Sequence, residues 1–253
     1  MIRSSRSILG VLSAVILSLT VASPAHAIAN GDPVPVGKYG FSVKLTMTGI
    51  PTADGGKRNS ACSGALVSPH WIITAGHCFR DANSVRVEYP VADLTSVDVG
   101  RTDLTDTSRG HQTKVVAVRQ SPTADVSLAQ LETPIYDVRP IQLGHVAPAV
   151  GATVRVTGYG SVTSTNPVPE TWLRTGQLSV VSLSDSVVGF HGLAPAPDTT
   201  PCPYDSGGPY FVEKGKKAFL VAVVSNGPSC PHTQTENGAR TDNITDWINS
   251  VIH

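Results

Sequence analysis

The stretch Tyr204–Pro209, Tyr-Asp-Ser-Gly-Gly-Pro, is the most informative part of this 253-residue chain. A serine followed by two glycines and a proline is typical of a tight turn that holds the hydroxyl of Ser206 toward solvent. A serine hydroxyl is a weak nucleophile, which becomes reactive when a base lies within hydrogen-bond reach and a third group orients that base. Ser206 is therefore a candidate nucleophile, although Ser-Gly turns without any chemistry are common.

The chain also supplies a candidate base and a candidate orienting group. His77 lies in Thr74–Cys78 (Thr-Ala-Gly-His-Cys), and Asp125 precedes the strand-like Val-Ser-Leu. The order His, Asp, Ser fits chymotrypsin-type chains, whereas subtilisin has Asp, His, Ser and α/β-hydrolases have Ser, Asp, His. The hydrolase motif G-x-S-x-G also fails here, because Tyr204 stands where its first glycine belongs.

Further motifs occur along the chain in a fixed order, and together they are specific. They are Ile28–Gly31, Trp71–Cys78, Asp125–Leu128, Gly158–Gly160, Asp205–Pro209, Ser225–Gly227 and Trp247–Ile248. On these motifs, the chain resembles the secreted trypsin-like (chymotrypsin-family) serine peptidases over nearly its whole length after the leader.

The first residues predict an export signal. Arg3 and Arg6 precede an apolar run of 15 residues, Ile8–Ala22, and Ala25–Ala27 (Ala-His-Ala) fits a cleavage site. Cleavage after Ala27 predicts secretion to the extracellular space and leaves 226 residues. The mature chain would carry 17 basic and 19 acidic residues, so its charge gives no reason to expect nucleic acid or a membrane surface as a partner.

Alternating apolar residues predict strands, among them Phe41–Met47, Val85–Tyr89 and Val154–Val156. Many short strands separated by turns indicate an antiparallel sandwich or barrel. The spacing of apolar residues in Ile244–Ile252 predicts a final helix, with possible caps in 241–243.

The resemblance implies an all-β fold of two six-stranded antiparallel Greek-key β-barrels with a C-terminal helix. We expect residues 1–27 to be the signal peptide. The first barrel would span 28–138 and hold His77 and Asp125, and the second would span 139–253 and hold Ser206 and the helix. Together, 28–253 would form one peptidase domain with its active site between the barrels.

Four cysteines in an exported chain suggest two disulfides, with three possible pairings. The resemblance implies the pairs Cys62–Cys78 and Cys202–Cys230. No C-x-x-C or H-x-x-x-H spacing occurs in the sequence, so we expect no metal site and no cofactor.

The resemblance also implies roles for residues around Ser206. The backbone N–H groups of Tyr204 and Ser206 would form the oxyanion hole, although Tyr204 replaces a glycine. The new amino terminus at Ile28 would pair with Asp205, and Ser225 would lie behind Asp125.

The substrate pocket is inferred from the resemblance alone. Thr200 stands where trypsin-like members have an aspartate, and Gly227 and Gly238 stand at the two wall positions. Asn226 replaces a tryptophan, and Arg240 replaces a tyrosine. An open, uncharged pocket would favour a bulky apolar side chain, whereas an inward Arg240 would favour an acidic one.

The sequence therefore predicts a secreted serine endopeptidase that hydrolyses polypeptides through an acyl-enzyme, and we expect it to be a monomer. The alternative is a catalytically weak or inactive homologue that acts as a binding protein. A third, narrower alternative is an esterase-like hydrolase on the same fold.

Overall fold

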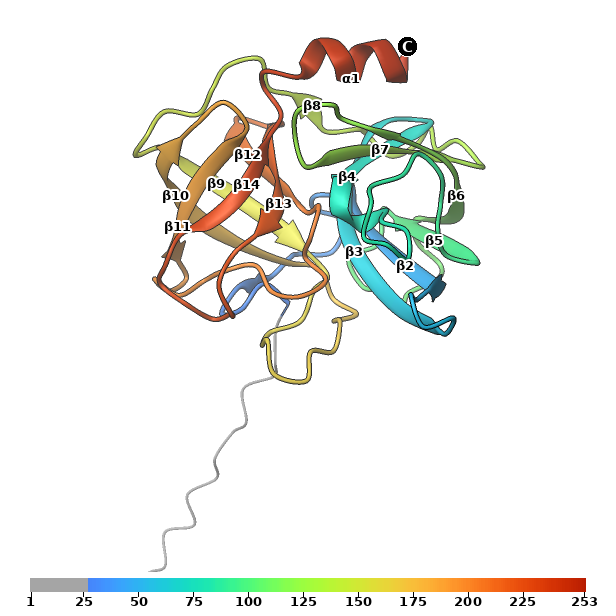
Figure 1. The fold of residues 1–253 in the computed structure, drawn as a ribbon. Coiled ribbons are helices and arrows are strands. Elements are labelled where there is room, and N and C mark those ends of the chain that lie inside the picture. The colour runs from blue at the N-terminus through green and yellow to red at the C-terminus, as the bar shows by residue number, and fades with distance from the viewer. Residues whose placement is uncertain (1–26) are drawn as a thin grey trace, which may run out of the picture.

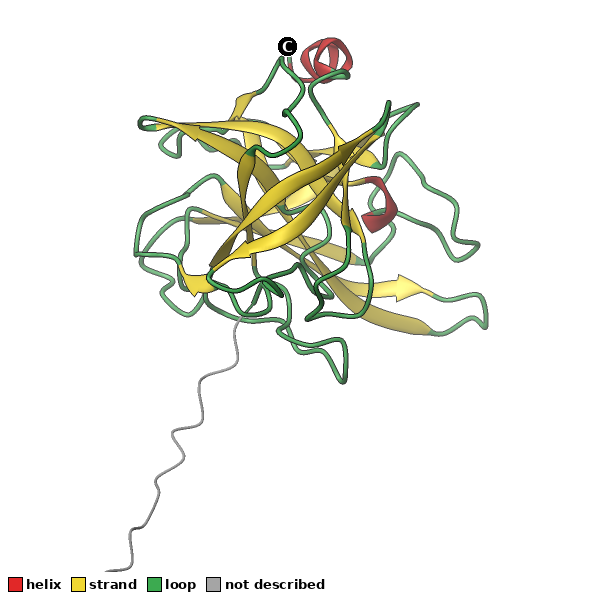
Figure 2. Cartoon of the chain, turned by 90° about the vertical axis from the view of Figure 1, so that its left-hand side faces the viewer, coloured by secondary structure: helices red, strands yellow, loops and turns green. Residues whose placement is uncertain are grey.

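Two β-barrels side by side make up the protein in the computed structural model, which describes residues 27–253 (Figure 1). Apart from Ala27, the predicted signal peptide lies outside the described residues. Strands account for almost all of the regular structure, and loops connect them (Figure 2). This is the predicted all-β fold.

The first barrel is a closed, antiparallel set of six strands in the order β2-β3-β4-β7-β6-β5. Alternation in sequence gives each strand a buried face: Val43, Leu45 and Met47 of β2 are almost fully buried. The strands are β2 (Ser42–Pro51), β3 (Lys57–Ser68), β4 (Trp71–Ala75), β5 (Leu94–Val99), β6 (His111–Gln120) and β7 (Val126–Leu131).

The second barrel also has six strands and closes because β9 pairs with both β10 and β12. Its β12 and β13 form a hairpin that turns at Gly215, which has a φ of 61°. The strands are β9 (Thr153–Gly158), β10 (Arg174–Leu183), β11 (Val187–Ala194), β12 (Pro209–Lys214), β13 (Lys217–Asn226) and β14 (Glu236–Arg240).

The two ends of the described chain contact parts of the fold beyond their nearest barrel in sequence. The short strand β1 (Asp32–Pro33) pairs with β10, so the start of the chain lies on the second barrel. The chain reaches that barrel again through β8 (Gln142–Leu143), which pairs with β13. The helix α1 (Thr245–Ile252) packs into a core that includes residues of both barrels. Among residues 27–253, no helix has the length and apolar character needed to cross a bilayer.

Aromatic rings and hydroxyl groups join the barrels along their seam. Phe41 and Phe211 meet edge to face with ring centroids 5.3 Å apart, and Tyr39 contacts the same Phe211 ring at 5.2 Å. The hydroxyls of Ser42 and Thr157 are hydrogen-bonded at 2.8 Å. Because the seam is packed like a core, it holds the two halves of the site in a fixed relation.

Two local predictions were wrong. No strand forms at 85–89, because the Asp81 carboxylate accepts the N–H groups of Asn83 and Val85, and Ser84 takes a φ of 64°, so the chain turns there. The side chain of Val85 is 57% exposed.

The predicted helix α1 is present, but no side chain in 241–243 caps it. Asp242 is bound by Arg240, and Asn243 donates a hydrogen bond to the Asp185 carbonyl. The side chains of these two residues therefore bind neighbouring segments rather than the first N–H groups of the helix.

The contact of α1 with the core can be tested at Ile248, which is fully buried. We expect Ile248→Ala to lower the free energy of unfolding by about 2–5 kcal/mol, because it removes buried carbons and leaves a cavity. Chemical denaturation followed by tryptophan fluorescence measures this. Ser250→Ala, on the exposed face of the same helix, should change stability by no more than about 0.5 kcal/mol. Equal effects of the two substitutions would show that α1 does not stabilise the core.

Candidate active site

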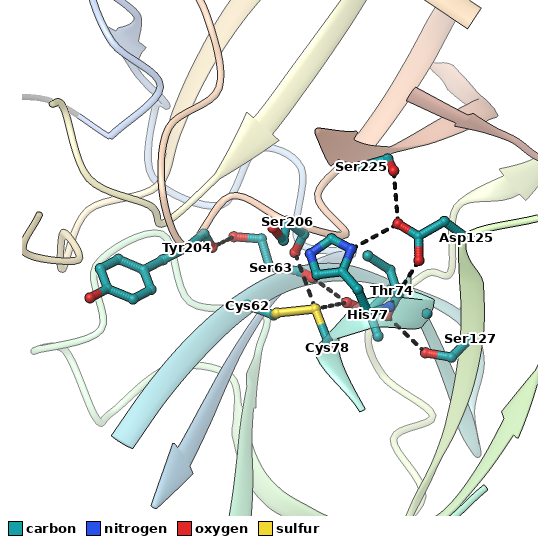
Figure 3. Close-up of a disulfide and its surroundings, with 12 residues drawn as sticks. Cys62, Ser63, Thr74, His77, Cys78, Asp125, Ser127, Tyr204, Ser206 and Ser225 are labelled. Carbon is teal, nitrogen blue, oxygen red and sulfur yellow. Dashed lines mark hydrogen bonds and ion pairs between the residues drawn. A yellow bond between two sulfur atoms is a disulfide. The ribbon is translucent and has the colours of Figure 1, made fainter. Parts of the chain in front are cut away.

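His77 and Asp125 are brought together by the pairing of two strands. His77 follows β4 in a short 3₁₀ turn, η1 (Gly76–Cys78), and Asp125 immediately precedes β7. The strands pair with Ala75 opposite Val126, so the two residues lie at the same barrel end. One oxygen of Asp125 accepts a hydrogen bond from the backbone N–H of His77 at 2.9 Å, and the other accepts one from the ring Nδ1 at 2.7 Å (Figure 3).

The carboxylate of Asp125 is held in its ionised form. Burial alone would raise its pKa, but hydrogen bonds from His77 and Ser225 outweigh burial and hold the pKa at about 2. The Ser225 hydroxyl donates at 2.7 Å from β13 of the other barrel, and the Asn226 amide donates to Ser225 at 3.1 Å. The sequence did not reveal this second link, in which Asn226 supports Asp125 through Ser225.

Ser206 lies at the junction of the barrels. Its backbone carbonyl accepts the N–H of Ser63 in β3 at 2.9 Å. Figure 3 shows Ser206 beside the His77 ring, with Asp125 on the ring's other side. No hydrogen bond joins the Ser206 hydroxyl to His77 in the described structure; such contacts are often long before substrate binds. Gly207, at a φ of 82°, is required here, because a Cβ would lie 2.0 Å from the Thr74 hydroxyl.

Tyr204 takes the backbone conformation of a glycine. The Asp205 N–H donates to the Cys202 carbonyl at 3.0 Å, which closes a turn with Pro203 and Tyr204 at its centre. Tyr204 has a φ of 77°, as expected for the third residue of a type II turn. Neither its N–H nor that of Ser206 donates a hydrogen bond to any residue in 27–253. Both donors are thus available to a bound group.

The Asp205 side chain is fully buried behind this turn. It accepts hydrogen bonds from the N–H groups of Gly160 at 2.8 Å, of Cys202 at 2.9 Å and of Ile28. Burial raises its pKa to about 7, although these donors oppose the rise. Ile28 and Asp205 are therefore in direct contact.

A buried cation, Lys44, lies one peptide unit from Asp205. Its ammonium donates to the Tyr159 carbonyl at 2.9 Å, and the N–H of the same peptide unit, from Gly160, donates to Asp205. Burial lowers the pKa of Lys44 to about 8, against the charges of Asp205 and Asp98. Lys44 thus partly balances the buried carboxylate.

A cavity of about 250 Å³ opens beside Ser206. Three of the residues expected to line the pocket do so: Ser225, Asn226 and Gly227. The lining also includes Glu236, which no motif in the sequence indicates.

The other three expected pocket residues do not line this cavity. Thr200 is buried elsewhere, with its backbone bonded to that of Ala29 at 2.8 Å. Gly238 lies inside the second barrel, where a Cβ would come within 3.1 Å of three side chains. The Arg240 guanidinium donates to both oxygens of Asp242, at 2.7 and 2.9 Å, and so does not face the pocket.

The resemblance places Gly238 at the pocket wall, and Glu236, two residues earlier in the sequence, therefore received no role. The strand β14 begins at Glu236, next to the pocket, whereas Gly238 pairs with Val224 deeper in the barrel. The only sequence signal was an acidic residue shortly after Cys230, and variable loop length makes such spacing ambiguous.

Two disulfides brace the site. Cys62 is bonded to Cys78, next to His77, and Cys202 is bonded to Cys230, next to the turn before Ser206. These are the pairings that the resemblance implies. Each restricts the unfolded chain and contributes about 3 kcal/mol in the loop-entropy account.

Two six-stranded barrels with a histidine, an aspartate and a serine at their junction define the chymotrypsin fold of serine peptidases. The sequence matches the trypsin family over residues 28–248, and the chain belongs to that family.

Relatives in the same family include animal proteins with modest identity. A beta-fibrinogenase-like protein of Daboia siamensis is 27% identical over 210 residues, which cover 76% of this chain and 77% of that protein. Serine proteinase stubble of Drosophila melanogaster is 26% identical over 255 residues, 90% of this chain and 31% of that protein. Snake venom serine protease KN13 of Trimeresurus stejnegeri is 25% identical over 263 residues, 94% and 92% respectively.

The conformation of Tyr204 generates a paired prediction. Tyr204→Gly keeps the N–H and the positive φ, so kcat should change by less than about threefold. Tyr204→Pro removes the N–H and forces a negative φ, so kcat should fall by about 100-fold or more, as for loss of an oxyanion donor. Steady-state hydrolysis of a peptide ester measures both. Equal activity of the two variants would exclude the Tyr204 N–H as a donor.

Proposed function

We propose that this chain is a secreted serine endopeptidase in which Ser206 is the nucleophile, His77 the general base and Asp125 the orienting group. The observation that carries the proposal is the pair of hydrogen bonds that His77 donates to Asp125, at 2.7 and 2.9 Å, with Ser206 beside the same ring (Figure 3). An ionised Asp125 that accepts from Nδ1 fixes the tautomer, which leaves Nε2 free to accept a proton.

The residues support the following cycle on a peptide bond. The Ser206 oxygen attacks the carbonyl carbon while its proton passes to His77 Nε2. The oxyanion that forms is bound by the free N–H groups of Tyr204 and Ser206. His77 then donates the proton to the leaving amine, which gives the acyl-enzyme. Water attacks the ester by the same proton route, and the peptide acid and free Ser206 are released.

We further propose that signal cleavage after Ala27 produces the active amino terminus. The Ile28 N–H already contacts the buried Asp205, and a free α-ammonium at that position would neutralise the carboxylate. Ile28 also has a φ of 50°, a conformation that costs a β-branched residue about 1–3 kcal/mol. Once Ile28 is the first residue, this torsion no longer exists, so cleavage would relieve the strain.

A fluorophosphonate probe tests the nucleophile. We expect the folded, secreted protein to be labelled on Ser206 and to lose all hydrolysis of peptides on labelling. Ser206→Ala should abolish labelling, whereas Ser164→Ala, at the pocket edge, should not. Intact folded protein that takes up no label would support the binding-protein alternative instead.

The amino terminus gives a second test. The mature protein should begin at Ile28 when sequenced. A form that begins at Ala27 should lose about 100-fold or more in kcat/KM, because a buried carboxylate loses its counter-ion. Ile28→Val, which keeps the ammonium and a β-branched side chain, is the matched control and should stay close to the parent. A mature start elsewhere, or full activity of the Ala27 form, would contradict this role.

A further inference from the structure

The cavity beside Ser206 contains one buried carboxylate and no fixed cation. Glu236 is 2% exposed and lines the cavity. The residues that line it include no lysine or arginine. Arg240, the nearest cation along the strand, is already bound to Asp242.

A second buried residue, His232, holds Glu236 in place. Its Nε2 and the Glu236 Oε1 are 2.7 Å apart, and its Nδ1 accepts the backbone N–H of Gln234 at 3.1 Å. Because Nδ1 is an acceptor, the proton of the neutral ring is on Nε2, which donates to Glu236. The pair therefore consists of a neutral imidazole and a carboxylate, and it brings one negative charge to the pocket.

The second carboxylate oxygen, Oε2, is available to a ligand. No hydrogen bond to it occurs among residues 27–253. It lies over Gly227, where a Cβ would come within 2.2 Å of it. Gly227 is thus the residue that makes room for the carboxylate at the pocket wall. Burial raises the pKa of Glu236, as expected for a carboxylate that lacks a full complement of partners.

We propose that Glu236 is the specificity-determining residue of this pocket, and that it selects substrates with a lysine or arginine side chain at the cleaved bond. A cationic side chain would supply the missing partner of Oε2, whereas an acidic one would face an unscreened like charge and an apolar one would leave the carboxylate unpaired. The proposal rests on the endopeptidase function above and replaces the apolar and acidic preferences expected from the sequence.

Matched peptide substrates test the preference. Lysine and norleucine differ at this position only by the ammonium group, so we expect kcat/KM to be about 100-fold higher for lysine at mildly alkaline pH. Glu236→Gln keeps the shape and the His232 contact but removes the charge. It should lower kcat/KM for lysine by about 30-fold and change that for norleucine by less than about threefold.

Two further variants separate charge from structure. Glu236→Asp keeps the charge and should retain part of the preference for lysine. Glu132→Gln removes an exposed carboxylate from the first barrel and should leave the preference unchanged. If the parent protein does not distinguish lysine from norleucine, or if Glu236→Gln keeps the preference, the proposal is overturned.

A binding measurement makes the proposal independent of catalysis. In Ser206→Ala, the fluorescent cation 4-aminobenzamidine should bind at least about tenfold more tightly than neutral 4-aminobenzamide, and Glu236→Gln should remove the difference. If Ser206 takes no fluorophosphonate but the cation still binds through Glu236, the enzyme function fails and the pocket assignment stands. If both probes bind equally, the pocket assignment fails whatever the activity.

Discussion

The buried carboxylate of Asp205 is the interaction on which the site depends. It accepts N–H groups from three separate segments, at Ile28, Gly160 and Cys202, and a buried Lys44 lies one peptide unit away. The chain leaves room for it, because a Cβ at Gly160 would come within 2.6 Å of the carboxylate. Since the next residue is Ser206, whatever fixes Asp205 also fixes the turn that carries Ser206 and the two free N–H groups. The conformation of the turn therefore depends on the charge of this carboxylate, and burial raises its pKa to about 7.

The seam between the barrels explains why the motif around Ser206 must contain small residues. The chain after Ser206 packs directly against β4, so Gly207 meets the Thr74 hydroxyl and Gly208 lies against the Thr157 carbonyl. Across the same seam, the hydroxyl of Ser225 donates a hydrogen bond to Asp125. Barrel packing therefore also fixes the geometry of the site, because a shift of either barrel would move His77 and Ser206 relative to each other.

The sequence predicted the parts of this molecule that depend on local motifs. The spacing of apolar residues predicted the helix at 245–252, and their alternation predicted strands. The two barrels and the meeting of His77 with Asp125 were implied by the family resemblance that the short motifs carry. The pocket depends instead on strand register: a shift of two residues exchanges Glu236 for Gly238, and the sequence alone did not fix it. Arg240 was also expected in the pocket, but it contacts Asp242 instead. The sequence offers Arg240 several possible acidic partners, and the packing of the chain determines which one it contacts. The apolar alternation at 85–89 predicted a strand, but no strand forms because the hydrogen bonds to the Asp81 carboxylate make the chain turn there.

The most direct test of the role of Asp205 is to titrate its carboxylate by carbon-13 NMR in two forms of the protein, one beginning at Ala27 and one at Ile28. In the Ala27 form, where an amide faces the carboxylate, the pKa should be about 7. In the Ile28 form, the facing ammonium favours the ionised carboxylate and should lower that pKa by about 1–3 units. The same midpoint in both forms would contradict the claim that the new amino terminus neutralises Asp205 and organises the site.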